Sequence, residues 1–183
     1  MFSDNSLTPR EAIRLCALGT LARSASAEGK TYNSLANEIR QFVSRITGPS
    51  LDLMGESLEL LKYEGLIQTI ESSKENHDPA LKITKEGVKV LNILLSSNIR
   101  AGNSELDKLI VALKLRFLYF LPEKDQLEQL EIIIDISSNE ITRLESLIEK
   151  KDNNLNLWLK NDITWLESRL EILTTLQQSI KNI

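Results

Sequence analysis

The side chains best suited to chemistry in this sequence are hydrogen-bond donors that can bind phosphate. Thr47 and Ser50 flank a Gly-Pro break, and hydroxyls at a turn and a helix N-terminus can donate to an anion. Arg40 and Arg45 precede the break, and the segment from 74 to 85 adds basic groups. The predicted phosphate contacts are Arg40, Arg45, Thr47, Ser50, Lys74, His77, Lys82 and Lys85. The alternative for the Lys and Arg residues is a plain solubilising role at the surface.

Catalysis finds no support in the residue types or their spacing. His77 is the only histidine and Cys16 the only cysteine, so neither a Cys/His pair nor a cluster of metal ligands is available. A glycine-rich phosphate loop is also missing. We therefore predict a protein that is not an enzyme and holds no metal and no cofactor. Cys16 is expected to be a small core residue, and His77 an exposed loop residue, with a phosphate contact as its functional alternative.

The phosphate-binding candidates lie on a pattern typical of a winged helix-turn-helix between Ser34 and Leu91. Apolar residues at helical spacing predict a first helix of the pair, with Leu35, Ile39, Phe42 and Val43 on its inner side. Gly48-Pro49 ends it, and a second helix runs from Ser50 to Gly65. Residues 67–72 and 80–83 are expected to be strands, and 73–79 the wing between them. A module of this kind usually reads DNA with its second helix in the major groove.

The charge of the chain leaves a second interpretation open. The net charge is −4, whereas a DNA-binding protein is expected to show a basic footprint. The start of the predicted recognition helix, residues 50–57, has no Lys or Arg and carries Asp52 and Glu56. Acids near a helix N-terminus also interact favourably with the helix dipole. Two hypotheses follow. The protein is either a regulator that binds double-stranded operator DNA or a winged-helix module whose acidic recognition helix binds a protein.

Three long amphipathic helices follow Asn98. Ser104 to Asp107 forms a capping box like that of Thr8 to Glu11 at the start of the chain. Apolar residues then recur at spacings of three and four, as in a coiled coil. The predicted dimerisation residues are Leu127, Leu130, Ile134, Ile141, Leu144, Ile148, Leu159, Ile163, Leu166, Leu170 and Leu173. A two-fold homodimer would cover these wide apolar faces, and the alternative is a self-contained helical hairpin.

The sequence therefore predicts a mainly α protein of two domains. Residues 1–98 are expected to form the winged helix-turn-helix with its small β-hairpin wing, and residues 104–183 the coiled-coil-like helical dimerisation domain. No signal peptide is apparent at the N-terminus, and no apolar run is long enough to span a bilayer. The single cysteine excludes an internal disulfide. These features favour a soluble cytoplasmic protein without membrane contact.

Five short motifs in a fixed order resemble the PadR family of transcriptional regulators, of the longer AphA-like kind with a C-terminal helical dimerisation domain. The motifs are Leu7–Ile13, Leu61–Ile67, Ile83–Gly87, Lys114–Leu118 and Trp165–Glu167. The family often has one tyrosine early in the helix that precedes the recognition helix and another in the recognition helix itself. This chain has Asn33 and Gly55 at these two positions.

The resemblance implies a homodimeric repressor of its own or a neighbouring operon that responds to a small ligand or signal. It also implies a cavity near the dimer axis for a small aromatic effector. Trp165 lies beside the apolar stripe of the last helix and could stack on such a ligand. The alternative is that Trp165 packs in the core or at the interface.

Overall fold

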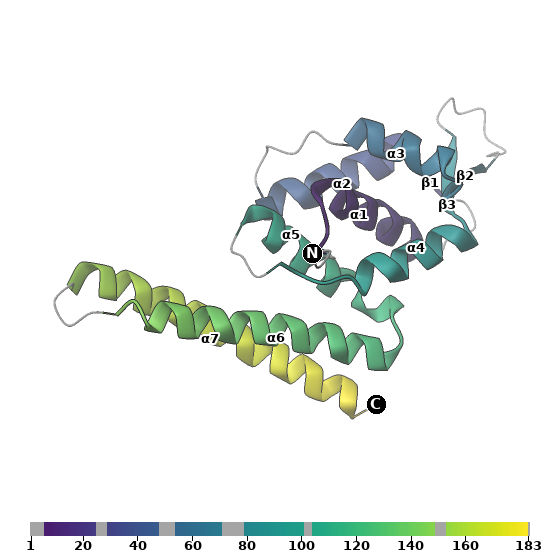
Figure 1. Ribbon diagram of the computed structural model, residues 1–183. Coiled ribbons are helices and arrows are strands. Elements are labelled where there is room, and N and C mark those ends of the chain that lie inside the picture. Colours follow the sequence, from purple (N-terminus) through teal and green to yellow (C-terminus); the bar gives the residue numbers. More distant parts are fainter. Residues whose placement is uncertain are drawn as a thin grey trace, which may run out of the picture. The chain divides into compact units, whose positions relative to one another are not determined.

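The computed structural model describes residues 6–24, 29–47, 54–70, 79–100, 104–148 and 153–182. The described chain divides into two compact units, one up to Phe120 and the other from Leu121. The first contains helices α1 to α5 and the three strands, and the second contains the long helices α6 and α7 (Figure 1). The mainly helical winged helix-turn-helix fold predicted from the sequence is confirmed. None of the described helices combines the length and apolarity that crossing a membrane requires.

Helix α1 (Pro9–Arg23) is the centre of the first unit. Nine of its residues are buried, so it is apolar on most sides rather than on one stripe. It packs against α2 (Tyr32–Thr47), α3 (Met54–Tyr63), α4 (Lys85–Leu95) and α5 (Glu105–Phe117). Its predicted capping box is confirmed: the Thr8 hydroxyl accepts from the Glu11 amide, and Glu11 Oε2 accepts from the Thr8 amide at 2.7 Å. Cys16 is buried here, as predicted.

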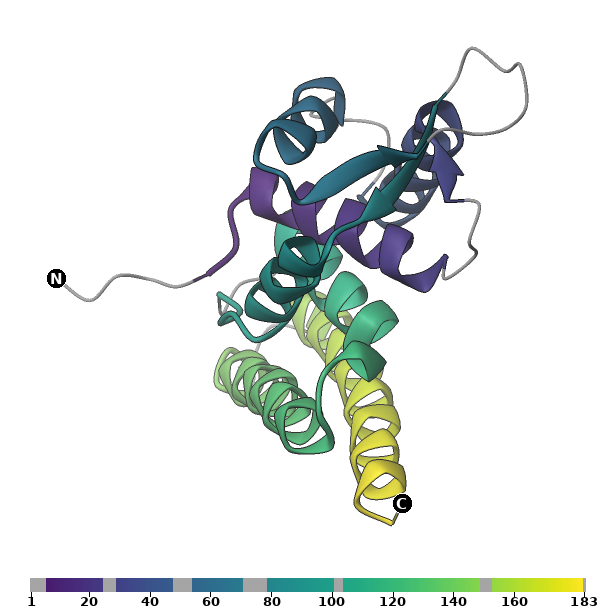
Figure 2. The same ribbon diagram turned by 90° about the vertical axis from the view of Figure 1, so that its right-hand side faces the viewer.

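A small antiparallel sheet lies beside α1. Strands β1 (Lys30–Thr31), β3 (Ala80–Ile83) and β2 (Ile67–Ile70) are adjacent in that order, and Figure 2 shows β2 and β3 running across α1. The bounds of β3 match the sequence prediction, whereas β2 ends at Ile70 and residues 71–72 lie outside the described chain. Gly65 has a φ of 71°, and this left-handed turn takes the chain from α3 into β2.

Helix α5 belongs to the first unit, although the sequence analysis placed residues 104–117 in the helical domain. Leu109, Leu113 and Phe117 are each 0% exposed, and α5 packs against α1 and α2. A Cβ atom on Gly19 would lie 2.5 Å from the Phe117 ring, so the missing side chain lets α5 approach α1 closely. After the short 3-10 helix η1 (Leu118–Phe120), the boundary between the units falls at residue 121.

The second unit is an antiparallel hairpin of α6 (Glu123–Glu145) and α7 (Asn153–Lys181), drawn in green and yellow in Figure 1. Leu144, Leu159 and Ile163 form a buried cluster, with Ile141 and Leu166 packed against it. These residues come from both helices at spacings of three and four. Part of the apolar pattern read from the sequence is therefore covered within one chain.

Candidate nucleic-acid interface

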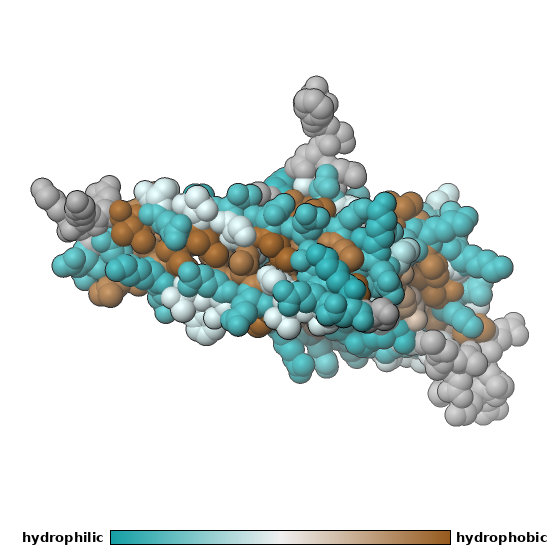
Figure 3. All heavy atoms as spheres, turned by 90° about the horizontal axis from the view of Figure 1, so that it is seen from below, coloured by the Kyte–Doolittle hydropathy of each residue, from teal (hydrophilic) through white to brown (hydrophobic). Residues whose placement is uncertain are grey.

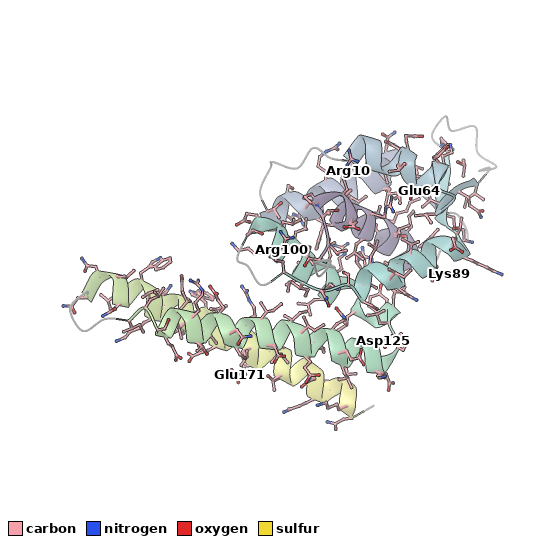
Figure 4. The ribbon with its side chains drawn as sticks, viewed as in Figure 1. Arg10, Glu64, Lys89, Arg100, Asp125 and Glu171 are labelled. Carbon is pink, nitrogen blue, oxygen red and sulfur yellow. The ribbon has the colours of Figure 1, made fainter. Side chains whose placement is uncertain are left out.

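Helices α2 and α3 with the β2–β3 pair are the parts of a winged helix-turn-helix that meet DNA. The structure describes α3 from Met54, and its side chains from Leu58 onward. The predicted contact Ser50 and the acidic residue Asp52 therefore lie outside the described residues, and of Glu56 only the helical backbone is described. Glu64, labelled in Figure 4, follows the last residue of α3. Its carboxylate accepts a hydrogen bond from Arg14 Nη2 at 2.8 Å. This ion pair ties the end of the recognition helix to α1.

Arg40 and Arg45 are both exposed on α2. Arg40 Nη1 donates to Asn37 Oδ1 at 3.0 Å, one turn earlier on the same helix. The hydroxyl of Thr47 donates to Val43 O at 3.0 Å, so its single hydrogen is already used within α2. Thr47 would have to turn its hydroxyl away from Val43 to donate to a phosphate as predicted.

Glu38 is the only acidic residue of α2, and its half-buried side chain pairs with cations of α1, β1 and α5. Its carboxylate accepts from Arg23 and Lys30 at 2.5 Å and from Arg116 at 2.9 Å. Partial burial would raise the pKa of Glu38, but the hydrogen bond from Lys30 and the charges of Lys30, Arg23 and Arg116 together hold the pKa below its usual value. The guanidinium of Arg116 also lies 4.3 Å from the ring centroid of Phe42.

The basic residues of the wing are divided between described and undescribed parts of the chain. Lys82 is exposed on β3 opposite Gln68 of β2, and Lys85 is exposed in the first turn of α4. Lys74 and His77 lie outside the described residues. Thr84 fixes the step from β3 to α4, because its hydroxyl donates to Gly65 O at 2.8 Å and accepts from Gly87 N at 3.0 Å. Gly87 has no room for a Cβ, which would overlap the carbonyl oxygen of Leu66.

The predicted dimerisation residues differ in exposure. Leu130, Leu144, Leu159, Ile163 and Leu173 are buried, and Leu127, Ile134, Ile141, Leu166 and Leu170 are half-buried. Ile148 is 37% exposed and follows the last residue of α6. The large exposed apolar side chains of α7 are not among these predicted residues. They are Leu155, Leu157, Trp158, Trp165, Ile172 and Leu176. Figure 3 shows a band of apolar residues along the hairpin.

Five of these side chains form a stripe on α7, consisting of Leu155, Trp158, Trp165, Ile172 and Leu176. With Asp162 and Arg169 included, the positions follow spacings of three and four over the whole stripe. The sequence analysis named Trp165 but missed Leu155, Ile172 and Leu176, although they have the same spacing as the predicted dimerisation residues, one position around the helix. Trp165 is 69% exposed, so it does not pack in the core of the chain.

Comparison with known proteins gives one family. The family model described as "Putative AphA-like transcriptional regulator" matches residues 2–177. PadR of Bacillus subtilis, solved in complex with operator DNA, is 12% identical over 92% of this chain and 98% of its own, with a TM-score of 0.40. The protein smu.1604c of Streptococcus mutans UA159 is 18% identical over 92% of this chain and 96% of its own, with a TM-score of 0.38. No curated protein sequence matches the chain.

Proposed function

The chain belongs to the AphA-like transcriptional regulators, and from this premise we propose that it is a homodimeric repressor that binds double-stranded operator DNA. The observation that carries the proposal is the family match, which extends over both the winged helix-turn-helix and the hairpin. In finer terms, the repressor acts in the cytoplasm and responds to a small ligand.

The distribution of charge supports DNA binding by the first unit. Residues 1–120 contain 15 Lys and Arg against 14 Asp and Glu, whereas residues 121–183 contain 7 against 12. The negative net charge of the chain therefore comes from the second unit, where acidic side chains are spread along α6. The first unit is therefore close to neutral, and local clusters of Arg and Lys decide its interaction with phosphates.

The proposed phosphate contacts in the described chain are Arg40, Arg45, Lys82 and Lys85. All four side chains are exposed, and none is engaged by a carboxylate in a described ion pair. Arg and Lys side chains of this kind position a protein on the duplex without reading its sequence. The residues that read bases are proposed to lie at the start of the recognition helix.

The test is a binding titration with the duplex DNA upstream of the protein's own gene, repeated over a series of salt concentrations. We expect the logarithm of affinity to fall linearly with the logarithm of salt concentration, because bound phosphates release counterions. A competing duplex of unrelated sequence should bind more weakly. If no duplex binds at any salt concentration, the DNA-binding proposal is wrong, and the interaction module with a protein partner replaces it.

The second copy in the proposed homodimer packs against the apolar stripe of α7. This surface exposes two tryptophans and an isoleucine at heptad spacing on a helix of 29 residues. Asp162 and Arg169 lie within the stripe on either side of Trp165. In a two-fold antiparallel pair of α7 helices, each Asp162 would approach the Arg169 of the partner. The stripe is thus self-complementary in charge as well as apolar.

A further inference from the structure

The outer side of the recognition helix α3 has an unusual composition. Its two buried leucines face the core, and Glu59, Leu60 and Tyr63 lie on the side away from them, where all three are exposed. We call these three residues the outer face of α3. Lys62 is the only Lys or Arg within the helix, and it lies about 160° around the axis from Leu60. The outer face therefore combines apolar groups with a carboxylate and has no cation.

The apolar part of the outer face is well exposed. Tyr63 has the largest exposed fraction of any large apolar or aromatic side chain in the described chain, at 90%. Leu60 is 41% exposed one turn before it. Side chains three residues apart are neighbours on a helix surface, so Leu60 and Tyr63 form one contact area. Apolar groups exposed side by side are typical of a surface that a partner covers.

Glu59 gives the same face a hydrogen-bond acceptor. It belongs to none of the ion pairs in the described chain, whereas the carboxylate of Glu64 is held by Arg14 at 2.8 Å. An ionised carboxylate accepts hydrogen bonds and donates none. In the major groove, cytosine presents only its N4 amino group as a donor, thymine presents a methyl group, and guanine presents the two acceptors N7 and O6. The outer face thus matches pyrimidines and opposes guanine.

We propose that the outer face of α3 selects an operator half-site in which thymine and cytosine are adjacent on one strand. Leu60 and Tyr63 contact thymine methyl groups, and Glu59 accepts a hydrogen bond from cytosine N4. This inference rests on the proposed DNA-binding function and names the base sequence class that the protein reads. It also adds three specificity-determining residues in the second half of the recognition helix.

Affinity and selectivity then come from different elements. The exposed cations of α2 and the wing bind phosphates on any duplex. The phosphates repel the carboxylate of Glu59 on every sequence, and this cost is smallest where cytosine N4 donates to it. Glu59 therefore lowers the affinity for all duplexes and raises the preference for the matching one.

The experiment begins with a pool of DNA duplexes that share a random central segment. The full-length protein selects its preferred duplex from the pool, and this duplex is then synthesised with uracil in place of each thymine in turn. The replacement removes only the methyl group. Fluorescence anisotropy measures binding by the unchanged protein, by Leu60→Ala and by the control Val88→Ala. Val88 is also 41% exposed but lies on α4. Circular dichroism melting curves check that each variant is folded.

We expect uracil at one contacted position to weaken binding by the unchanged protein and by Val88→Ala about fourfold. This is the factor for one methyl-sized group lost from an apolar contact. Leu60→Ala should bind the thymine and uracil duplexes equally at that position, and Tyr63→Ala should do so at a second one. Glu59→Gln should lose preference for cytosine over guanine beside the sensitive thymine, because the amide of glutamine also donates.

The possible failures are distinguishable. If the unchanged protein binds DNA but no uracil replacement alters its affinity, the outer face does not read thymine and the DNA-binding function stands. The same conclusion follows if Leu60→Ala and Tyr63→Ala remain as sensitive to uracil as Val88→Ala. If the pool yields no bound duplex, both the inference and the DNA-binding function are wrong. The outer face of α3 would then belong to an interface with a protein.

Discussion

Lys114 is the most unusual single residue in the described chain. It is 0% exposed, and its ammonium donates to Leu95 O at 2.5 Å and to Ser97 O at 2.6 Å. Leu95 is the last residue of α4 and Ser97 lies just beyond it, so this lysine of α5 donates to carbonyl oxygens at the C-terminal end of that helix. Burial lowers the pKa of Lys114 to about 7. Its charge state therefore changes close to neutral pH, where an ordinary lysine remains protonated.

The first prediction concerns the pH dependence of stability. The pKa of Lys114 is about 7 in the folded protein and near 10.5 in the unfolded chain, so the unfolded chain binds more protons between these values. The free energy of unfolding should therefore rise with pH in this window, by at most about 1.4 kcal/mol per pH unit. Below about pH 7 both states are protonated, and the cost of burying the charge is fully present. Urea unfolding at several pH values measures the effect.

Lys114→Met is the control for this prediction, because it removes the titration and keeps an apolar side chain of similar length. It also leaves the carbonyl groups of Leu95 and Ser97 without their donor, at a cost of about 1–3 kcal/mol each. That cost does not depend on pH. The difference in unfolding free energy between the two proteins should therefore change across the window. A constant difference would mean that the carbonyl groups keep the ammonium charged.

At the level of helices and strands, the sequence predicts local features better than it predicts which helices pack against each other. Both capping boxes and the bounds of β3 are confirmed, because they depend on residues close together in the chain. The docking of α5 on α1 and α2 was not predicted. An apolar stripe indicates which side of a helix is covered but not what covers it. Gly19 was the available signal, since a glycine inside a buried helix often marks the close approach of another element.

The second prediction tests this docking. In an ordinary helix, Gly→Ala stabilises by about 1 kcal/mol. At Gly19 the new methyl group would overlap the Phe117 ring, so Gly19→Ala should instead destabilise the protein by about 1–3 kcal/mol. Equilibrium unfolding in urea gives the sign. The double variant Gly19→Ala/Phe117→Leu should recover part of the loss, and simple additivity of the two single variants would argue against a direct clash.

At the scale of the whole molecule, the same apolar periodicity serves two purposes in the second unit. Leu144, Leu159 and Ile163 hold the hairpin together, and the stripe on α7 remains exposed. The sequence analysis set a homodimer against a self-contained hairpin as alternatives. In the structure the hairpin forms within one chain, and the apolar stripe on α7 still remains exposed. The sequence could not separate the two sets, because their positions on α7 are adjacent and equally spaced.

The third prediction is that Trp165→Asp/Ile172→Asp converts a dimer into a monomer. Both side chains are 69% exposed within one chain, so their replacement should leave the hairpin core intact while placing charges inside the proposed interface. Sedimentation equilibrium gives the mass. Lys160→Asp is the matched control, since it adds a carboxylate to an exposed position of α7 outside the stripe. A monomeric unchanged protein, or a double variant that still sediments as a dimer, would contradict the proposed interface.

The fourth prediction concerns the proposed effector. Trp165 and Trp158 are 69% and 60% exposed, so flat aromatic compounds can reach both indoles in the free chain. If a small aromatic ligand stacks on Trp165 near the dimer axis, titration should quench tryptophan emission to a saturating level. Trp165→Phe should remove this signal, and Trp158→Phe should preserve it. The two variants are chemically matched, so they control for nonspecific quenching of an exposed indole.

The monomeric double variant cannot report on this ligand, because it lacks Trp165. Ile172→Asp alone supplies the missing comparison, since it disturbs the stripe and keeps both tryptophans. A ligand held between two chains should then bind Ile172→Asp more weakly than the unchanged protein. Equal quenching of Trp158 and Trp165, growing linearly with ligand concentration, would indicate collision with exposed rings. The protein would then be a regulator without an aromatic effector at this surface, and Trp165 would act in dimer packing alone.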